Sequence, residues 1–326
     1  MPATQPLAIV AGVLAREDGR VLVCTRPAGR AMAGFQEFPG GKRESGEGRW
    51  EALARELREE LDVRPTAGRP LIRLRHDYPD GPRVDLDFWR VEAWQGQVRA
   101  LEGQGLAWQQ PAELDPAAML AANRPVVTAL RLPSRYLVTP EAPAGQETSF
   151  LETLEASLER RPAILVQLRG RWLSRADGAW AEQAVLRARH RGARVLINGD
   201  GELARRVGAD GVHCPATQLE EIPTLRASGD FWIGASCHDA GELARAAERG
   251  ADFATLGHLQ STPSHPDQPP LGWAAFRELV HEAGLPVYGI GGLGEADLRA
   301  LHDCGAQGYA AIRDLWAGSR EAPQGA

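Results

Sequence analysis

Short apolar runs alternate with amphipathic segments along most of the chain. Residues 50–61 place Trp50, Leu53, Leu57 and Leu61 three and four positions apart, which predicts an amphipathic helix. Apolar runs bounded by Gly, Pro or Asp lie on either side of it and predict strands. The predicted strands of this first part cover residues 7–14, 20–25, 70–77 and 84–94.

From Tyr136 onward, apolar runs and helical runs alternate regularly. Such alternation predicts parallel strands joined by helices, and eight strands in chain order predict a compact TIM (β/α)8 barrel. The predicted strands are Tyr136–Thr139, Ile164–Leu168, Val195–Asn198, Gly211–Cys214, Trp232–Ser236, Phe253–Leu256, Val287–Ile290 and Tyr309–Ile312.

The predicted helix 50–61 also carries a cluster of acidic residues. Glu56, Glu59 and Glu60 are neighbours on the helix surface because positions three and four apart lie side by side. Like charges there repel one another by a few tenths of a kcal/mol per pair. A hard dication bound by the carboxylate oxygens would convert this repulsion into binding energy. A solvated acidic helix is the alternative.

The residues around this helix resemble the Nudix box, Gly-x5-Glu-x7-Arg-Glu-apolar-x-Glu-Glu-x-Gly-apolar. The matching residues are Gly41, Glu47, Arg55, Glu56, Leu57, Glu59, Glu60 and Val63. Asp62 stands where the family has its last Gly, and Asp tolerates the left-handed conformation that a helix C-cap requires. The resemblance implies a hydrolase domain with the fold of an α/β/α sandwich.

Three further segments narrow the resemblance to the MutT type, the 8-oxo-dGTP diphosphatases. The segment 26–39 supplies Arg26 and Phe35, which the resemblance assigns to substrate binding. In Glu102-Gly103-Gln104, it makes Glu102 a further metal ligand or a general base. In the segment 122–126, it makes Asn123 the residue that reads the edge of the oxidised purine.

Each of these assignments has a structural alternative. Glu102 is also compatible with a solvated loop residue, Asn123 with a helix cap, and Phe35 with core packing. An amide both donates to and accepts from a base edge, which favours purine reading for Asn123.

The resemblance also implies a mechanism and a cofactor. Mg2+, with Mn2+ as an alternative, would neutralise charge on the phosphates. Glu102 or Glu59 would deprotonate the attacking water, and Arg55 would orient the carboxylates. The products would be pyrophosphate and 8-oxo-dGMP, a reaction of nucleotide-pool sanitation and DNA repair. The implied metal ligands are Gly41, Glu47, Glu56, Glu59, Glu60 and Glu102.

Residues 135–317 resemble the thiamine phosphate synthase/TenI family. Most of the shared motifs follow predicted strands, at the end of a barrel where chemistry takes place. They include Gln167-Leu168-Arg169, Gly234-Ala235-Ser236-Cys237-His238, Leu256-Gly257-His258, Ser261-Thr262-Pro263-Ser264 and Gly289-Ile290-Gly291-Gly292.

Departures from the synthase pattern favour the TenI branch of that family. Synthases hold Mg2+ and pyrophosphate with two Asp residues, but Gly199 and Gln218 stand at the matching positions. Asp200 is one residue out of register. Arg171 and His265 stand near two positions that are lysines in synthases. Without the metal carboxylates, displacement of pyrophosphate is not expected.

The TenI branch is a thiazole tautomerase, and the resemblance assigns proton transfer to His258. Imidazole suits that role because its pKa lies near neutral pH. Gly291 and Gly292 would cradle a phosphate with backbone N–H groups. An inherited, hydrogen-bonded histidine and a structural turn are the respective alternatives.

Composition limits the remaining possibilities. At 326 residues the chain is long enough for two domains, expected at 1–132 and 135–317, followed by a tail at 318–326. A formal charge of −6 argues against stable nucleic-acid binding. Lys42 is the only lysine, which excludes Schiff-base chemistry outside the Nudix box.

Cysteine usage and the N-terminal residues predict a cytoplasmic location. Cys24, Cys214, Cys237 and Cys304 show no metal-binding spacing, so buried thiols and a reducing compartment are expected. The first twenty residues contain no long apolar core, so neither a signal peptide nor a membrane span is expected.

The sequence therefore leads to one hypothesis for each domain. The first domain would be an Mg2+-dependent pyrophosphohydrolase of a nucleoside triphosphate, 8-oxo-dGTP, and its alternative substrate is a thiamine-related diphosphate. The barrel would be TenI-like, and its alternative is a sensor that binds thiazole or thiamine phosphate without turnover.

Overall fold

The computed structural model describes residues 6–77, 83–162, 164–227, 231–262 and 268–320. Their contacts divide the chain into two compact units. The first comprises the residues up to Arg131 together with 280–285 and 302–305, and the second comprises the remaining residues from Leu132 onward.

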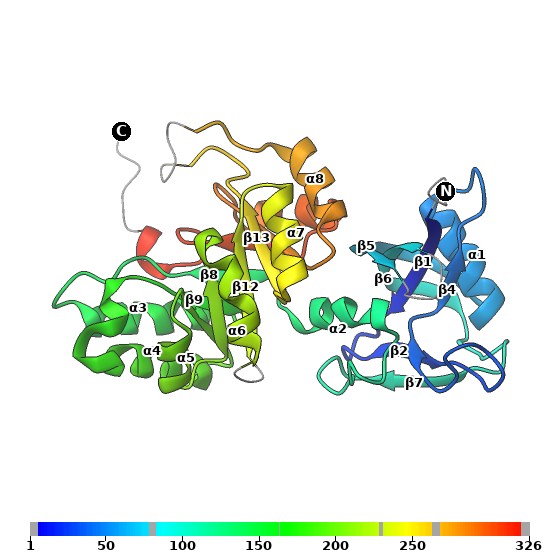
Figure 1. Ribbon diagram of the computed structural model, residues 1–326, viewed down its shortest axis with the longest axis horizontal. Helices are drawn as coiled ribbons and strands as arrows, with labels where there is room; N and C mark the ends of the chain where they lie inside the picture. The colour runs from blue at the N-terminus through cyan, green and yellow to red at the C-terminus, as the bar shows by residue number, and fades with distance from the viewer. Residues whose placement is uncertain (1–5, 78–82, 163, 228–230, 263–267, 321–326) are drawn as a thin grey trace. The chain divides into compact units, whose positions relative to one another are not determined.

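Two sheets form the framework of the first unit (Figure 1). A mixed sheet has the strand order β4-β1-β6-β5, in which β1 and β6 are parallel, and a small antiparallel sheet has the order β3-β2-β7. The strands are β1 (Leu7–Leu14), β2 (Val21–Thr25), β3 (Gln36–Glu37), β4 (Gly40–Lys42), β5 (Val63–Asp77), β6 (Arg83–Gly96) and β7 (Gly105–Gln109). The helices are α1 (Arg49–Leu61), η1 (Ala121–Asn123) and α2 (Arg124–Arg131).

Strand β1 separates two hydrophobic layers because its side chains alternate between the faces of the sheet. Val10 and Leu14 pack in one cluster with Leu57 of α1, whereas Val13 packs in another with Val126 of α2. A helix therefore covers each face of the mixed sheet, which confirms the predicted α/β fold class.

The sequence underestimated strand β5. It begins at Val63 rather than near residue 70, although Pro65, Gly68 and Pro70 are unfavourable in a strand. Its register against β6 shifts at Pro65, at Ala67 and after Pro70, so bulges accommodate the residues that would interrupt a regular ladder. Strands β3, β4 and β7 were not predicted, because such short segments show no clear alternation.

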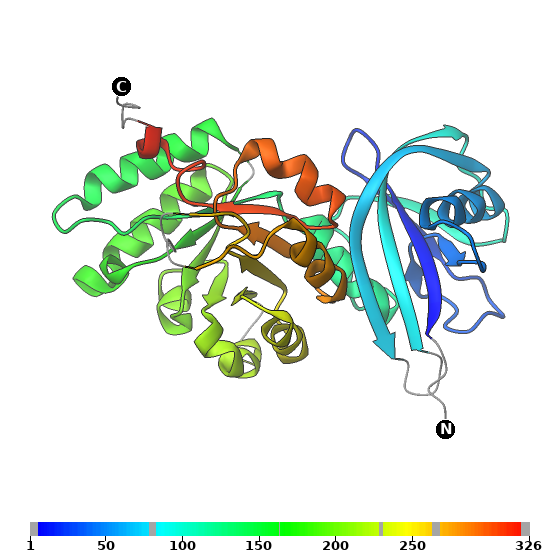
Figure 2. The same cartoon turned by 90° about the horizontal axis from the view of Figure 1, so that it is seen from above.

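Strands β8 to β15 of the second unit close into a parallel barrel, with helices α3 to α9 outside it (Figures 1 and 2). Each predicted strand is present within one residue at either end, which confirms the TIM barrel. The strands are β8 (Arg135–Val138), β9 (Leu165–Leu168), β10 (Arg194–Asn198), β11 (Gly211–Cys214), β12 (Trp232–Cys237), β13 (Phe253–Gly257), β14 (Val287–Ile290) and β15 (Gly308–Ala311). The helices are η2 (Arg171–Gly178), η3 (Ala216–Glu221), η4 (Glu295–Asp297), η5 (Ala317–Arg320), α3 (Glu147–Arg160), α4 (Ala179–His190), α5 (Gly201–Arg206), α6 (Ile222–Ala227), α7 (Ala240–Arg249), α8 (Trp273–Glu282) and α9 (Leu298–Asp303).

Aromatic side chains fill the N-terminal end of the barrel interior. The rings of Tyr136 and Tyr288 each lie 5.5–5.6 Å from one another and from the ring of Phe253. All three are fully buried, and they lie near the beginnings of their strands. The opposite, C-terminal end of the barrel remains available for polar residues.

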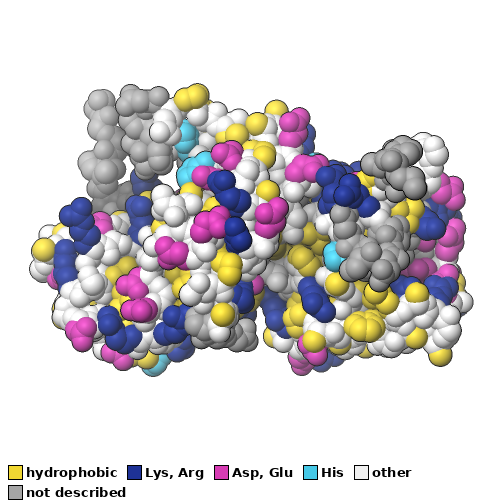
Figure 3. Space-filling view, in the orientation of Figure 1, with side chains coloured by type: hydrophobic (Ala, Val, Ile, Leu, Met, Phe, Trp, Pro, Cys, Tyr) yellow, Lys and Arg dark blue, Asp and Glu magenta, His cyan; other side chains and the backbone are white. Residues whose placement is uncertain are grey.

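Charged side chains of both signs are mixed on the surface, and the cysteines are buried thiols, as the sequence predicted. Acidic and basic side chains are interspersed on the face in Figure 3. Cys24, Cys214, Cys237 and Cys304 are free and buried. Within the described ranges, no helix combines the length and the apolar character needed to cross a bilayer.

Candidate functional site

The acidic residues of the first unit are presented by α1. The helix begins after Gly48, whose N–H donates to Glu51, and buries Leu53, Leu57 and Leu61. It ends at Asp62, which adopts the predicted left-handed conformation, with φ 60° and ψ 32°. The burial of one face leaves the acidic face turned towards β4 and the loop that follows β6.

Arg55 organises three of the carboxylates. Its Nε and Nη2 donate to the two oxygens of Glu47, each at 3.0 Å, while Nη1 donates to Glu56 at 2.9 Å and to Glu59 at 3.2 Å. Nη2 also donates to the carbonyl oxygen of Lys42 at 2.9 Å. The hydrogen bonds from Arg55 lower the pKa of Glu47, and those to Glu47 and Glu56 raise the pKa of Arg55. The arginine therefore favours the ionised form of Glu47.

Glu60 lies in a more buried position than its neighbours. Its Oε2 accepts a hydrogen bond from the Gly40 N–H at 3.0 Å. Burial raises the pKa of Glu60 to about 8 and outweighs this hydrogen bond, and the charges of Glu102, Glu37 and Glu56 raise the pKa further. A cation beside Glu60 would offset that electrostatic cost.

Gly41 approaches the same carboxylate group closely. A Cβ atom at this position would lie 2.4 Å from Oε2 of Glu56, so a larger residue would displace the carboxylate. The backbone of β4 therefore lies against the side chains of α1, whose carboxylate oxygen atoms gather at this contact. Oxygen ligands of this kind suit Mg2+ and Mn2+.

The carboxylate groups point towards different partners rather than towards a common centre. Among the described residues, no group of three or more His, Cys, Asp or Glu side chains is arranged closely enough to hold an ion. The contacts explain this, because Glu47, Glu56 and Glu59 turn towards Arg55 and Glu60 turns towards Gly40. The donor set fits a hard dication, but its binding requires rotation of these side chains.

Glu102 is near this group but has a different partner. Its carboxylate pairs with Arg30 at 2.9 Å, and its N–H donates to Gln104 at 2.9 Å. Gln104 in turn donates to the carbonyl oxygen of Glu60 at 2.9 Å, which fastens this loop to the end of α1. The sequence did not identify the roles of Arg30 and Gln104, because neither belongs to the Nudix box.

The residues assigned to substrate binding differ in exposure. Phe35 is 41% exposed, which excludes the alternative of core packing. Arg26 donates to the carbonyl oxygen of Ala31 at 2.9 Å and to Glu37 at 2.6 Å, so part of its guanidinium shapes its own loop. Glu37 is therefore a further residue of this region that the sequence did not assign.

Asn123 joins two segments that are far apart in the sequence. It is buried, and its Oδ1 accepts a hydrogen bond from the Phe38 N–H at 3.2 Å rather than from the first turn of α2. Within the described part of the chain, its Nδ2 has no hydrogen-bond partner. The side chain is thus held in place through its oxygen, while its amide N–H groups can bind a ligand.

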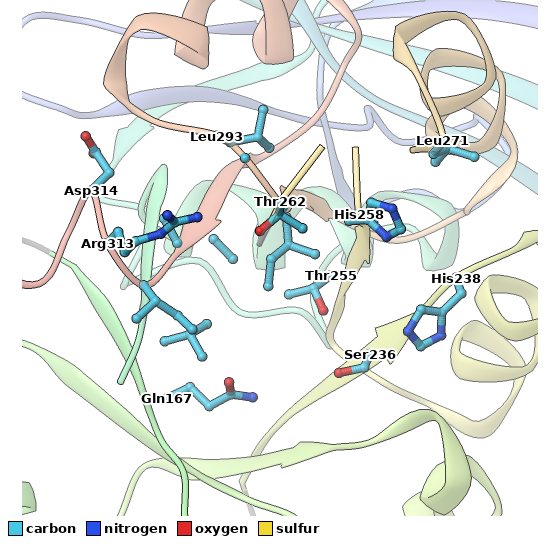
Figure 4. Close-up of a pocket in the computed structure, with 18 of the residues that line it drawn as sticks. Gln167, Ser236, His238, Thr255, His258, Thr262, Leu271, Leu293, Arg313 and Asp314 are labelled. Atoms are coloured by element: carbon cyan, nitrogen blue, oxygen red, sulfur yellow. The ribbon is translucent and has the colours of Figure 1, made fainter. Parts of the chain in front are cut away.

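The second unit contains a cavity of about 1580 Å³ at the C-terminal ends of the barrel strands (Figure 4). Gln167, Ser236 and Thr255 line it from β9, β12 and β13. Asn198 also lines it and accepts a hydrogen bond from Gln167 at 3.3 Å. The cavity is therefore placed where a TIM barrel carries its site.

His258 lies in the wall of this cavity (Figure 4). Its Nε2 donates to the carbonyl oxygen of Gln268 at 3.2 Å. Because a carbonyl oxygen only accepts, the neutral form of His258 carries its proton on Nε2 and its lone pair on Nδ1. Pro263, Ser264 and His265 lie outside the described residues.

Gly291 and Gly292 form a turn beside His258. Their φ angles are 97° and 74°, and a Cβ atom on Gly291 would lie 2.4 Å from that of His258. Within the described residues, the N–H groups of Gly292 and Leu293 have no intramolecular acceptor, and the guanidinium of Arg313 has no partner. These groups line one side of the cavity and suit an anion.

The positions that differ from synthases have no carboxylate facing the cavity. Gly199 has a φ of 71°, and its carbonyl oxygen accepts from Gln218 at 3.2 Å. Asp200 caps α5 by accepting from the Leu203 N–H at 2.8 Å. Arg171 donates its backbone N–H to Glu141 at 2.9 Å, outside the cavity lining.

Comparisons with known proteins also divide the chain between residues 129 and 135. Residues 10–129 match the family described as NUDIX domain, and residues 135–315 match thiamine monophosphate synthase. Over 125 residues, the chain is 35% identical to the 8-oxo-dGTP diphosphatase of Escherichia coli strain K12, a match that covers 38% of this chain and 96% of that protein.

Two further relatives are similar to the two parts. Over 180 residues, a thiamine-phosphate synthase of Roseiflexus castenholzii is 33% identical, and the match covers 54% of this chain and 78% of that protein. A solved structure from a study of MutT from Aliivibrio salmonicida and Vibrio cholerae is 35% identical, with a TM-score of 0.33. The match covers 39% of this chain and 97% of the chain in that structure.

Proposed function

The chain belongs to the NUDIX domain family and to the thiamine monophosphate synthase family, and from that premise we propose that its first domain hydrolyses 8-oxo-dGTP. The products are 8-oxo-dGMP and pyrophosphate, and the reaction contributes to nucleotide-pool sanitation and DNA repair. The observation that carries the proposal is the buried amide of Asn123, which is anchored through its oxygen and keeps its N–H groups available for a ligand. We also propose domain limits of 1–132 and 135–317, with a tail at 318–326.

The acidic face of α1 supports the use of Mg2+, with Mn2+ as an alternative. Gly41, through its backbone, and Glu47, Glu56, Glu59, Glu60 and Glu102 would hold the ion. When bound, it supplies positive charge to the phosphates and lowers the cost of phosphoryl transfer. Arg55 favours the ionised form of Glu47 and orients both Glu47 and Glu56 through hydrogen bonds.

The remaining steps belong to side chains of the domain. Glu102 or Glu59 accepts the proton of the attacking water. Release of Glu102 from its ion pair with Arg30 leaves the carboxylate free to accept that proton. Phe35 stacks on the base because it is exposed beside the site, and Asn123 donates to the purine edge through Nδ2. The Nη2 of Arg26 contacts the nucleotide.

The test is a comparison of substrates with the full chain. Pyrophosphate and phosphate release is measured for 8-oxo-dGTP, dGTP and thiamine diphosphate, with Mg2+ or Mn2+. The expected result is a higher kcat/KM for 8-oxo-dGTP than for the other two. Faster hydrolysis of thiamine diphosphate would establish the alternative, a Nudix hydrolase of a thiamine-related diphosphate.

For the barrel we propose a proton shift on a thiazole carboxylate phosphate, as in a thiazole tautomerase. His258 takes and returns the proton, and Gly291, Gly292 and Arg313 receive the phosphate. The capping role of Asp200 supports this reaction over synthesis, because that carboxylate cannot replace the metal ligands of synthases. The second candidate is a sensor that binds thiazole or thiamine phosphate without turnover. The observation that favours it is the size of the cavity.

A further inference from the structure

A row of hydrogen bonds runs from the aromatic core of the barrel to the cavity. The hydroxyl of Tyr136 lies 3.0 Å from Nδ1 of His213, and Nε2 of His213 lies 2.9 Å from Oγ of Ser236. Tyr136 and His213 are buried, at 0% and 1% exposure, whereas Ser236 lines the cavity (Figure 4). The row therefore has one end inside the core and one end at the ligand.

The donor-to-acceptor direction of the hydrogen bonds in this row follows from its buried end, at Tyr136. Within the described residues, the Tyr136 hydroxyl has His213 as its hydrogen-bond partner and no other. Its proton must go to Nδ1, since a buried O–H without an acceptor costs about 1–3 kcal/mol. The proton of a neutral His213 is then on Nε2 and is donated to Ser236, whose own proton has no acceptor in the row.

The surroundings of His213 keep it in this arrangement. Gly234 faces the ring, and a Cβ atom there would lie 2.6 Å from Nδ1, so a glycine is needed to make room for the imidazole. Burial lowers the pKa of His213 to about 3. The ring is therefore neutral near pH 7, and because its Nε2 already carries a proton, that nitrogen cannot accept one from Ser236.

We propose that Tyr136 and His213 are positioning residues that make Ser236 a hydrogen-bond donor to the ligand. The bound ligand therefore has a carboxylate oxygen at the Ser236 hydroxyl. Ser236 lies across the cavity from Leu293 and Arg313 (Figure 4), so this oxygen is distinct from the phosphate at the Gly292 turn. The identity of the ligand, a thiazole carboxylate phosphate, rests on the proposed function. The direction of the hydrogen bonds does not.

The first test uses the free protein and needs no ligand. Long-range 1H–15N NMR spectra of the full chain, labelled at histidine, report which nitrogen of His213 is protonated, with His213→Gln to assign the signal. The expected state at pH 7 is neutral with the proton on Nε2. Tyr136→Phe removes the donor and should abolish this preference, while Tyr288→Phe should preserve it. A proton on Nδ1 in the unmodified protein would overturn the proposal.

Tyr288 provides a matched control for that test. It is also a fully buried tyrosine of the same ring cluster, but its hydroxyl donates to the carbonyl oxygen of Pro133 at 2.6 Å. A general effect of losing a buried hydroxyl would appear in both variants. An effect on the tautomer of His213 should appear in Tyr136→Phe alone.

The second test measures binding of two compounds that undergo no turnover. These are the aromatic carboxythiazole phosphate and the same thiazole phosphate without its carboxylate, titrated calorimetrically. The carboxylate should improve affinity about tenfold, the scale of one hydrogen bond to a charged acceptor. Ser236→Ala and Tyr136→Phe should remove most of this gain, and the double variant should lose no more than Ser236→Ala alone.

Three outcomes of the binding test would contradict the proposal. They are a gain that survives Ser236→Ala, additive losses in the double variant, and no difference between the compounds in the unmodified protein. A failure of the tautomerase reaction would be visible separately, as binding with no proton exchange, and would leave the hydrogen-bond direction intact.

Discussion

Arg55 donates two parallel hydrogen bonds, each 3.0 Å long, to the carboxylate of Glu47. The pair joins helix α1 to the loop that precedes it, and the same guanidinium reaches Glu56 and the carbonyl oxygen of Lys42. Because these contacts use a planar fork of donors, an ammonium group of equal charge cannot reproduce them.

Replacing Arg55 by Lys should therefore lower kcat for 8-oxo-dGTP by about tenfold or more while keeping the positive charge. Arg58→Lys is the matched control, since Arg58 lies in the last turn of the same helix and makes no ion pair with a described residue. Steady-state kinetics of the two variants check this. Equal activity in both would show that charge alone is sufficient at position 55.

Glu56→Gln and Glu60→Gln should each reduce turnover at least about 100-fold, the scale for loss of a catalytic charge or base. The fold should persist, because the amide retains the shape of the side chain and an oxygen acceptor. Glu51→Gln, at the start of the same helix, serves as the control. Removal of divalent cations by EDTA should abolish activity, and Mg2+ should restore it. Near-normal hydrolysis in both variants would refute the mechanism.

Asn123→Ala should reduce discrimination between 8-oxo-dGTP and dGTP by about 1–3 kcal/mol, through the loss of hydrogen bonding from Nδ2 to the purine edge. The variant also leaves the Phe38 N–H without its acceptor, which lowers stability but affects the two substrates equally. The ratio of their kcat/KM values separates the two effects. An unchanged ratio would leave Asn123 with only its link to Phe38.

The reaction that the barrel catalyses distinguishes between its candidate functions. With Gly199 and Gln218 at the positions of the synthase carboxylates, no thiamine phosphate should form from a pyrimidine diphosphate and thiazole phosphate. A thiazole carboxylate phosphate should instead exchange a proton, observed by NMR, and His258→Ala should stop the exchange. Thiamine phosphate synthesis by the full chain would assign it to the synthase branch. Binding that persists unconverted in His258→Ala would indicate a sensor.

The buried His213 predicts how stability depends on pH. Burial lowers its pKa from 6.5 in the unfolded chain to about 3 in the folded protein. Between these values the unfolded chain binds a proton that the folded protein does not. The free energy of unfolding therefore falls by about 1.4 kcal/mol per pH unit from this residue as the pH drops below 6.5.

His213→Gln removes this titration and retains groups that can hydrogen-bond. The stability of the original protein relative to the variant should thus decrease by about 2 kcal/mol between pH 7 and pH 5, measured by chemical denaturation. His190→Gln, at the exposed end of α4, controls for the loss of an imidazole. A difference that stays constant over this range would show that His213 is not buried in a neutral form.

Local patterns in the sequence were sufficient for most of the framework. The apolar run in residues 7–14 reflects a strand that is buried on both faces, and the periodicity in residues 50–61 reflects burial of one helix face. Each element could therefore be predicted from its own residues. The barrel strands were found for the same reason. The first half of β5 was missed, because the effect of Pro65 and Gly68 depends on bulges against β6.

The acidic face of α1 was also apparent from the sequence alone, since Glu56, Glu59 and Glu60 are neighbours through helix geometry. What each carboxylate binds was decided by the tertiary structure. Asn123 meets Phe38 across 85 positions of the chain, and Tyr136 meets His213 across 77. A hydrogen bond extends about 3 Å and depends on the angle at the donor, and no spacing in a sequence specifies the folded path that brings such distant groups together.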